Sequence, residues 1–140
     1  MEINGIAHAF VSCTDFARSR AFYSQLLPFL GMKPVLDGDG IYYCVGGRTA
    51  FGIQPVSEEH AGEPFDQWRT GLHHICFRAR SREDVDTLYQ FLQQIDTAIV
   101  HPPEDGPWAP GYYSVLFEDP DGVRLECNFV PGKGLLEGKS

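Results

Sequence analysis

The sequence predicts an α+β fold of two βαβββ modules, whose strands form an open, cleft-like β-barrel with the helices outside. Three observations predict it: an internal duplication, the order of strand and helix patterns, and a short turn before the last strand. The 140 residues are enough for one sizeable core, so we expect a single domain. Its parts are a first module (1–54), a linker (55–70), a second module (71–130) and a C-terminal tail (131–140).

The duplication begins with a strand and a helix that recur 66 residues later (74 − 8 = 66). A predicted strand at 3–13 ends at a helix cap, Thr14 or Asp15, and a predicted strand at 72–79 ends at the cap Ser81. Both following helices carry apolar residues at helical spacing. The matched pairs are Ile6 with Leu72, His8 with His74, Asp15 with Ser81, Tyr23 with Tyr89, and Leu26 with Leu92.

Three more strands are expected after each helix. They lie at 33–36, 40–46 and 49–54 in the first module, and at 98–101, 112–118 and 123–129 in the second. Tyr42 matches Tyr112 at an offset of 70, and Gln54 matches Glu126 at an offset of 72. The offset changes only in loops, as a duplication requires. The turn "EDPDG" is too short for a crossover, so the strands it joins are antiparallel.

Composition and charge exclude several classes of function. The chain is 43% hydrophobic and carries a net charge of −8, which favours a globular protein and disfavours nucleic acid or an anionic membrane as a partner. No signal peptide opens the chain and no apolar run is long enough to span a membrane. The four cysteines, none in a C-x-x-C, are interpreted as buried thiols in a reducing cytoplasm, with a disulfide as the alternative: Cys13, Cys44, Cys76 and Cys127.

Alternation along the strands predicts which side chains face the concave side of the barrel. Val123, Leu125 and Cys127 form an apolar face toward the helices, which leaves Glu126 on the other face. The same argument for the other strands adds three residues to the concave face, His8, Gln54 and His74. Because His8 matches His74 and Gln54 matches Glu126, a pseudo-two-fold axis would bring the four side chains together.

Two imidazoles and one carboxylate are a donor set typical of a divalent metal such as Fe, Mn, Zn, Ni or Co. We therefore predict that His8, His74 and Glu126 hold one divalent ion, with the amide oxygen of Gln54 as a weak fourth donor. Taken singly, a strand histidine is more often structural, and Glu126 could be a solvated strand residue. The competitor His73 shares a face with Ile75 and Phe77, while two histidines near loops lack a symmetry mate, His60 and His101.

The sequence leaves the roles of several other polar and aromatic residues undecided. Three aromatic residues more often indicate packing than substrate stacking, Trp108, Tyr112 and Tyr113. Arg78 and Arg124 serve either surface ion pairs or a substrate anion.

The stretches "IAHAFVSCTDFARSRAFYSQLLPFLG", "GLHHICFRARS" and "VLFEDPDGVRLE" together resemble the vicinal oxygen chelate superfamily. That superfamily includes glyoxalase I, fosfomycin-resistance thiol transferases, extradiol dioxygenases and bleomycin-binding proteins, and the resemblance covers nearly the whole chain. It implies a glyoxalase-like fold, with metal ligands on the first and last strands of each module. By motif position these places are His8, His74 and Glu126, with Gln54 at the remaining one.

The chain departs from each well-known subfamily. Glyoxalase I usually has a glutamate where this chain has Gln54, and fosfomycin transferases usually present cationic groups where "PPEDGPWAPG" has no lysine. Bleomycin-binding relatives lack the metal set, and typical extradiol dioxygenases are longer, with four modules. The substrate and the metal therefore stay open.

The resemblance implies a metal-dependent enzyme that holds a small substrate through two adjacent oxygens, with lyase or isomerase chemistry first and dioxygenase-like chemistry second. Either Glu126 or a metal-bound hydroxide would move the proton. The alternative is a resistance-type protein that binds a drug-like or aromatic ligand without turnover. Relatives pair their modules within one chain or across two, and the linker 55–70, which reaches roughly 50 Å at ~3.3 Å per residue, permits both. We expect a homodimer.

Overall fold

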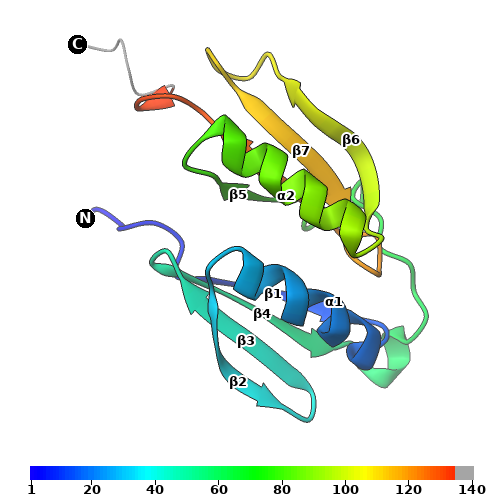
Figure 1. Cartoon of the computed structure of the whole chain (residues 1–140). Coiled ribbons are helices and arrows are strands. Elements are labelled where there is room, and N and C mark those ends of the chain that lie inside the picture. Colours follow the sequence, from blue (N-terminus) through cyan, green and yellow to red (C-terminus); the bar gives the residue numbers. More distant parts are fainter. Residues whose placement is uncertain (135–140) are drawn as a thin grey trace. The chain divides into compact units, whose positions relative to one another are not determined.

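The structure, a computed structural model, describes residues 1–134. The last part of the predicted tail, 135–140, lies outside the described residues. The chain divides into two compact units, Met1–Pro64 and Phe65–Ser140, each with its own sheet and its own helix (Figure 1). The boundary between the units falls inside the polar segment that the sequence predicted as a linker.

The first unit is a βαβββ module, as predicted. Its elements are β1 (His8–Cys13), α1 (Phe16–Phe29), β2 (Lys33–Gly38), β3 (Ile41–Gly46) and β4 (Thr49–Pro55), followed by the short 3₁₀ helix η1 (Glu58–His60). The strand order is β1-β4-β3-β2. β1 and β4 are parallel because the chain passes through α1 and two further strands between them, whereas β2–β3 and β3–β4 are antiparallel hairpins.

The second unit repeats this topology. Its elements are β5 (Ile75–Arg78), α2 (Arg82–Gln94), β6 (Ala98–Asp105), β7 (Tyr113–Glu118) and β8 (Arg124–Phe129). The strand order is β5-β8-β7-β6, with β5 and β8 parallel and the other pairs antiparallel. The predicted α+β class and the two βαβββ modules are therefore confirmed. The joining of the modules into one open barrel stays a prediction.

Both helices begin at the predicted caps. The side chain of Asp15 accepts a hydrogen bond from the backbone N–H of Arg18, and that of Ser81 accepts one from Asp84. Each helix lies against its own sheet (Figure 1). The buried apolar stripe of each helix packs there, so that each unit has its own core. The fully buried residues of these stripes are Tyr23, Leu26 and Leu27 in α1 and Val85, Leu88 and Leu92 in α2. Neither helix is long enough, or apolar enough, to cross a membrane, and residues 1–134 contain no other candidate.

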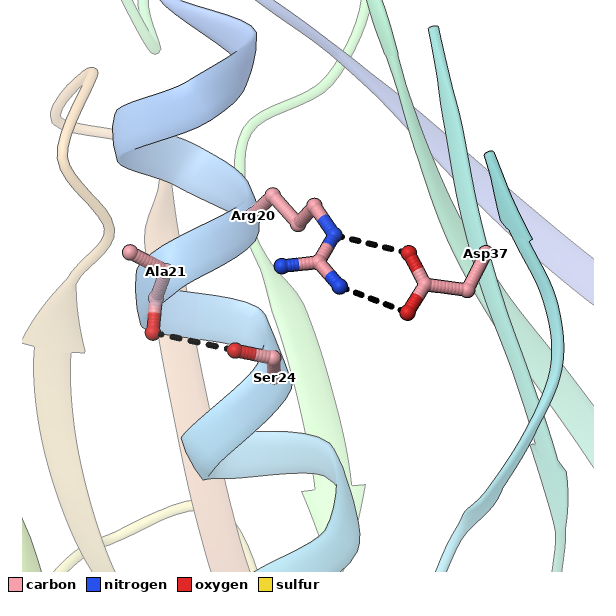
Figure 2. A network of polar contacts seen from close by, with 4 residues as sticks. All are labelled: Arg20, Ala21, Ser24 and Asp37. Atoms are coloured by element: carbon pink, nitrogen blue, oxygen red, sulfur yellow. Dashed lines mark hydrogen bonds and ion pairs between the residues drawn. The ribbon is translucent and has the colours of Figure 1, made fainter. Parts of the chain in front are cut away.

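An arginine on each helix also binds an aspartate on the outermost strand of its sheet. In the first unit, Nε and Nη2 of Arg20 donate to the two carboxylate oxygens of Asp37 at 2.7 and 2.6 Å (Figure 2). In the second unit, Arg82 donates to Asp105 at 2.6 and 3.4 Å and lies 3.7 Å from the ring centre of Tyr113. The hydrogen bond from the guanidinium lowers the pKa of each aspartate below its ordinary value.

Several strand boundaries and the burial of one cysteine differ from the sequence predictions. The strands expected to begin at residues 3 and 72 begin later, at His8 and Ile75, and the strand expected at 98–101 runs on to Asp105. None of the four cysteines forms a disulfide, and three are buried, but Cys76 is exposed. Its side chain alternates away from the helix-facing residues Ile75 and Phe77, so a position inside a strand does not by itself bury a thiol.

The strand register corrects the internal alignment. Phe10 pairs with Gly52 in the first unit, and Cys76, its equivalent at the helix offset of 66, pairs with Glu126 in the second. The last strands therefore match at an offset of 74 (126 − 52), and Gly52, not Gln54, corresponds to Glu126.

The same comparison corrects the third strand of each module. Tyr42 pairs with Ile53, and Val115 pairs with Cys127, so Tyr42 corresponds to Val115 and not to Tyr112. The additional residues lie mainly in β6, which runs to Asp105 with two register shifts, and in the loop after it. Bulges of this kind leave no periodic signal that an alignment by sequence can follow.

Candidate functional site

A cavity of about 560 Å³ lies within the second unit and is lined by several of its ionisable and aromatic side chains. The residues on its wall that bear on chemistry are His73, His74, His101, Trp108, Tyr112 and Glu126. A cavity of this size suits a small organic molecule. Two of the four predicted ligands, His74 and Glu126, lie on this wall.

Glu126 lies in the middle of β8, between Cys76 of β5 and Leu116 of β7. Only 9% of the residue is exposed, so its carboxylate needs polar partners inside the unit. The hydroxyl of Tyr112 donates to Oε1, and Nε2 of His74 lies 3.5 Å from Oε2. The carboxylate is thus held on one oxygen and faces an imidazole with the other.

Tyr112 reaches Glu126 from the residue just before β7. Burial raises the pKa of this phenol, and the hydrogen bond to Glu126 raises it further, because a phenolate beside a carboxylate is disfavoured. Tyr112 is therefore a proton donor throughout the neutral range. The sequence interpretation of this tyrosine as packing missed the contact, since Tyr112 and Glu126 lie 14 residues apart and no spacing rule joins them.

His73 and His74 lie immediately before β5 and contact each other. Their Nδ1 atoms are 2.8 Å apart and their rings cross at 78°. The indole of Trp68 packs edge-on against His73, with ring centres 5.0 Å apart. The prediction that His73 and His74 point to opposite faces assumed a strand from residue 72, but alternation does not hold outside the strand, which begins at Ile75.

The equivalent surface of the first unit is aromatic instead of charged. The ring of Phe10 stacks on that of Tyr43, with centres 5.3 Å apart and planes 16° apart. Both rings lie over Gly52, where a Cβ atom would be 2.6 Å from Phe10 and 2.8 Å from Tyr43. The position that corresponds to Glu126 therefore has no room for a side chain.

The two predicted ligands of the first unit, His8 and Gln54, lie on the same face of its sheet but far from each other. His8 is exposed, lies edge-on to Phe10 with ring centres 5.9 Å apart, and pairs with Ala50. Gln54 pairs with Ser12, four positions further along β4, which is roughly 13 Å at ~3.3 Å per residue. Gln54 as a ligand stays a prediction, now without the support of symmetry.

The remaining candidates have local partners. His101 contacts the carbonyl oxygen of Pro102 at 2.8 Å and lines the cavity, although the sequence argument set it aside. His60 lies on η1, 3.1 Å from Glu63. Arg124 forms an ion pair with Glu118 at 2.8 Å and also lines the cavity.

The donors of the second unit fit part of a metal site. An imidazole Nε2 and a carboxylate Oε2 at 3.5 Å are chemically suited to one borderline divalent ion. Within the described part of either unit, no three histidine, cysteine, aspartate or glutamate side chains gather as a metal-binding group. The pair His74–Glu126 would therefore need at least one further protein donor, or would leave the rest of the coordination to water and substrate.

Comparison with known proteins places the chain in a family. A profile of the Glyoxalase/Bleomycin resistance protein/Dioxygenase superfamily matches residues 5–127, and the chain belongs to this superfamily. It is 27% identical over 123 residues to the uncharacterized protein YqjT of Bacillus subtilis, covering 85% of this chain and 94% of YqjT.

Solved structures agree. A putative glyoxalase from Bacillus halodurans shares 28% identity and superposes with a TM-score of 0.80, over 91% of this chain and 96% of that one. Lactoylglutathione lyase from Agrobacterium tumefaciens, at 21% identity and a TM-score of 0.68 over 91% and 95% of the two chains, shares the fold.

Proposed function

We propose that this protein is a metal-dependent enzyme of the vicinal oxygen chelate type that acts on a small molecule bound through two adjacent oxygens. The observation that carries the proposal is the His74–Glu126 pair, whose Nε2 and Oε2 atoms lie 3.5 Å apart on the wall of a cavity large enough for such a substrate. Superfamily membership supports it.

His74 and Glu126 would hold one divalent ion, one of Fe, Mn, Zn, Ni or Co, with His8 as the third protein ligand. Gln54 is a further candidate, weaker because an amide oxygen is neutral and because Gly52 takes the equivalent place. The bound ion would polarise the substrate oxygens and stabilise negative charge on them.

The side chains of the cavity would orient the substrate and move its proton. Glu126, whose Oε2 faces Nε2 of His74 at 3.5 Å, is the proposed base for a proton next to a carbonyl group. Tyr112 binds Oε1 and thereby fixes the orientation of the carboxylate. Trp108 and His101 also line the cavity, where their rings could contact the substrate. Isomerase or lyase chemistry is proposed first, and dioxygenase-like chemistry second.

The second candidate function is binding of an aromatic or drug-like molecule without turnover. The Phe10–Tyr43 stack favours it, because it offers a flat apolar surface where a catalytic carboxylate would otherwise lie. Metal content separates the two functions, since a binding protein of this kind needs no ion.

The test is the metal content of the purified, untagged protein and of six alanine variants. His8→Ala, His74→Ala and Glu126→Ala should each lose stoichiometric metal, because each removes a proposed ligand. The matched controls His60→Ala, His73→Ala and His101→Ala should keep a measurable stoichiometric site when metal is supplied in excess. Full occupancy in the His74→Ala variant would remove this residue from the ligand set.

We also propose that the protein is a cytoplasmic homodimer. If the modules pair across two chains, His8 of one protomer would join His74 and Glu126 of its partner. Refolding a mixture of His8→Ala and Glu126→Ala protein would then restore metal binding in a fraction of the heterodimers. A monomer at micromolar concentration by light scattering would contradict the dimer.

A further inference from the structure

The contact between His73 and His74 constrains where their protons lie. Two Nδ1 atoms 2.8 Å apart share one hydrogen bond, in which one ring donates N–H and the other accepts with its lone pair. A neutral imidazole carries one proton, so the role of Nδ1 decides the state of Nε2. The Nε2 atom of His74 is the one that faces Glu126.

Two arrangements are possible, and only one suits a ligand. If His73 donates, Nε2 of His74 carries the proton and points it toward the carboxylate. If His74 donates, its Nε2 presents a lone pair beside Oε2 of Glu126, and His73 carries its own proton on Nε2. A metal ion takes the lone pair, so the second arrangement is the one that binding requires.

Tyr112 has the same relation to Glu126 that His73 has to His74. Its hydroxyl donates to Oε1, the carboxylate oxygen that does not face the imidazole. His74 and Glu126, which we call the inner pair, face each other through Nε2 and Oε2. The other polar atom of each side chain has a partner of its own: Nδ1 of His74 contacts His73, and Oε1 of Glu126 contacts Tyr112. The packing of Trp68 on His73 fixes the outer imidazole in turn.

We propose that His73 and Tyr112 are positioning residues: His73 accepts the Nδ1 proton of His74 and so frees its Nε2, while Tyr112 holds Oε1 of Glu126 and so directs Oε2 to the same point. This inference rests on the proposed metal-binding function. It assigns a role to the histidine that strand alternation had placed on the helix side, and to the tyrosine that had been interpreted as packing.

The first readout is Zn²⁺ affinity, measured by calorimetry on the full chain. His73→Phe keeps the ring that packs on Trp68 but removes the acceptor, and Tyr112→Phe removes only the hydroxyl. Each should weaken Zn²⁺ binding about 10-fold, the lower end of the usual effect of such outer partners, because both ligands themselves remain. His73→Asn should restore affinity to within about 3-fold, since its Oδ1 can accept the same proton.

The second readout is the tautomer, from the nitrogen and ring-proton correlations of ¹⁵N-labelled protein by NMR. In the metal-free wild type, His74 should carry its proton on Nδ1 and His73 on Nε2. In the metal-free His73→Phe protein, this preference of His74 for Nδ1–H should be lost. A purely structural role for His73 would change neither tautomer.

Matched controls are His60→Phe and Tyr113→Phe. His60 lies outside the cavity, and the hydroxyl of Tyr113 donates to Asp86 at 2.6 Å, not to the inner pair. Both should bind Zn²⁺ as the wild type does. Unchanged affinity in His73→Phe and Tyr112→Phe, with a wild type that binds Zn²⁺, would overturn this inference alone. A wild type that binds no Zn²⁺ would overturn the metal-binding function and, with it, the positioning role.

Discussion

The two units have the same order of helices and strands but different side chains at equivalent positions of their sheets. Both have a capped helix, a parallel pair of strands and two hairpins, and in both an arginine on the helix binds the edge strand. At one equivalent position, however, the first unit has Gly52 beneath two aromatic rings, and the second has Glu126 bound to Tyr112.

This difference shows that a duplicated fold need not keep a duplicated site. The second unit has ionisable groups at this place, and the first has an aromatic surface.

The largest expected effect tests whether the two cores are equivalent. Leu26 and Leu92 match at the offset of 66, and both are completely buried. Leu26→Ala and Leu92→Ala should each lower the free energy of unfolding by about 2–5 kcal/mol, because each leaves a cavity under a helix. Urea unfolding followed by circular dichroism measures both, with the exposed Gln90→Ala as a control that should change by less than about 0.5 kcal/mol. If one of the two leucine variants lost almost no stability, the two cores would not be equivalent.

The next effect tests the aromatic surface of the first unit. Gly52→Ala places a Cβ atom against the rings of Phe10 and Tyr43, and we expect a loss of about 1–3 kcal/mol as the stack is pushed apart. Phe10→Ala removes the nearer of the two rings and leaves that of Tyr43 free to shift, so the double variant should lose less stability than the sum of the two single variants. Thermal unfolding of the three proteins gives the coupling. Strict additivity would mean that the rings do not restrict position 52.

The smallest expected effect is the pH dependence of the stability that the two arginine–aspartate ion pairs contribute. The guanidinium holds the pKa of Asp37 and of Asp105 below the ordinary value. Between the folded and the unfolded pKa the unfolded chain therefore binds more protons than the folded one, so the free energy of unfolding decreases as the pH falls. The contribution is complete above about pH 4 and is lost as the pH falls through the lower, folded value.

Asp37→Asn and Asp105→Asn should therefore lower the melting temperature slightly at pH 7, and the difference from wild type should shrink at pH 3. The effect should be larger for Asp37, which makes two short contacts and is 44% exposed at its side chain, against 72% for Asp105. An equal deficit at both pH values would mean that the carboxylate charge contributes nothing.

Most of the fold was predictable because helices and hairpins leave periodic signals. The caps Asp15 and Ser81, the buried stripes and the antiparallel final strands followed from spacing and turn length alone. The register of the strands did not follow, because the bulges in β6 shift its pairing with β7 without changing the alternation of apolar and polar residues in the sequence. The prediction that equated Gln54 with Glu126 was wrong for this reason.

The candidate site was predictable only in part. The position of Glu126 on the face away from the helix followed from alternation, and its nearness to His74 is as predicted. The contacts of Tyr112 and His73 did not follow, since one depends on the path of a loop and the other on where β5 begins. Whether His8 completes the site stays a prediction.

The crowding at Gly52 also has a consequence for how this sequence can change over generations. A glutamate at position 52 would require the aromatic stack to give way first, since its Cβ atom would lie 2.6 Å from the ring of Phe10 and 2.8 Å from that of Tyr43. The order of the two mutations therefore matters: one order passes through a destabilised intermediate, and the other first gives up the aromatic stack. Each route therefore passes through a step with a cost, which would keep position 52 a glycine in descendants of this chain.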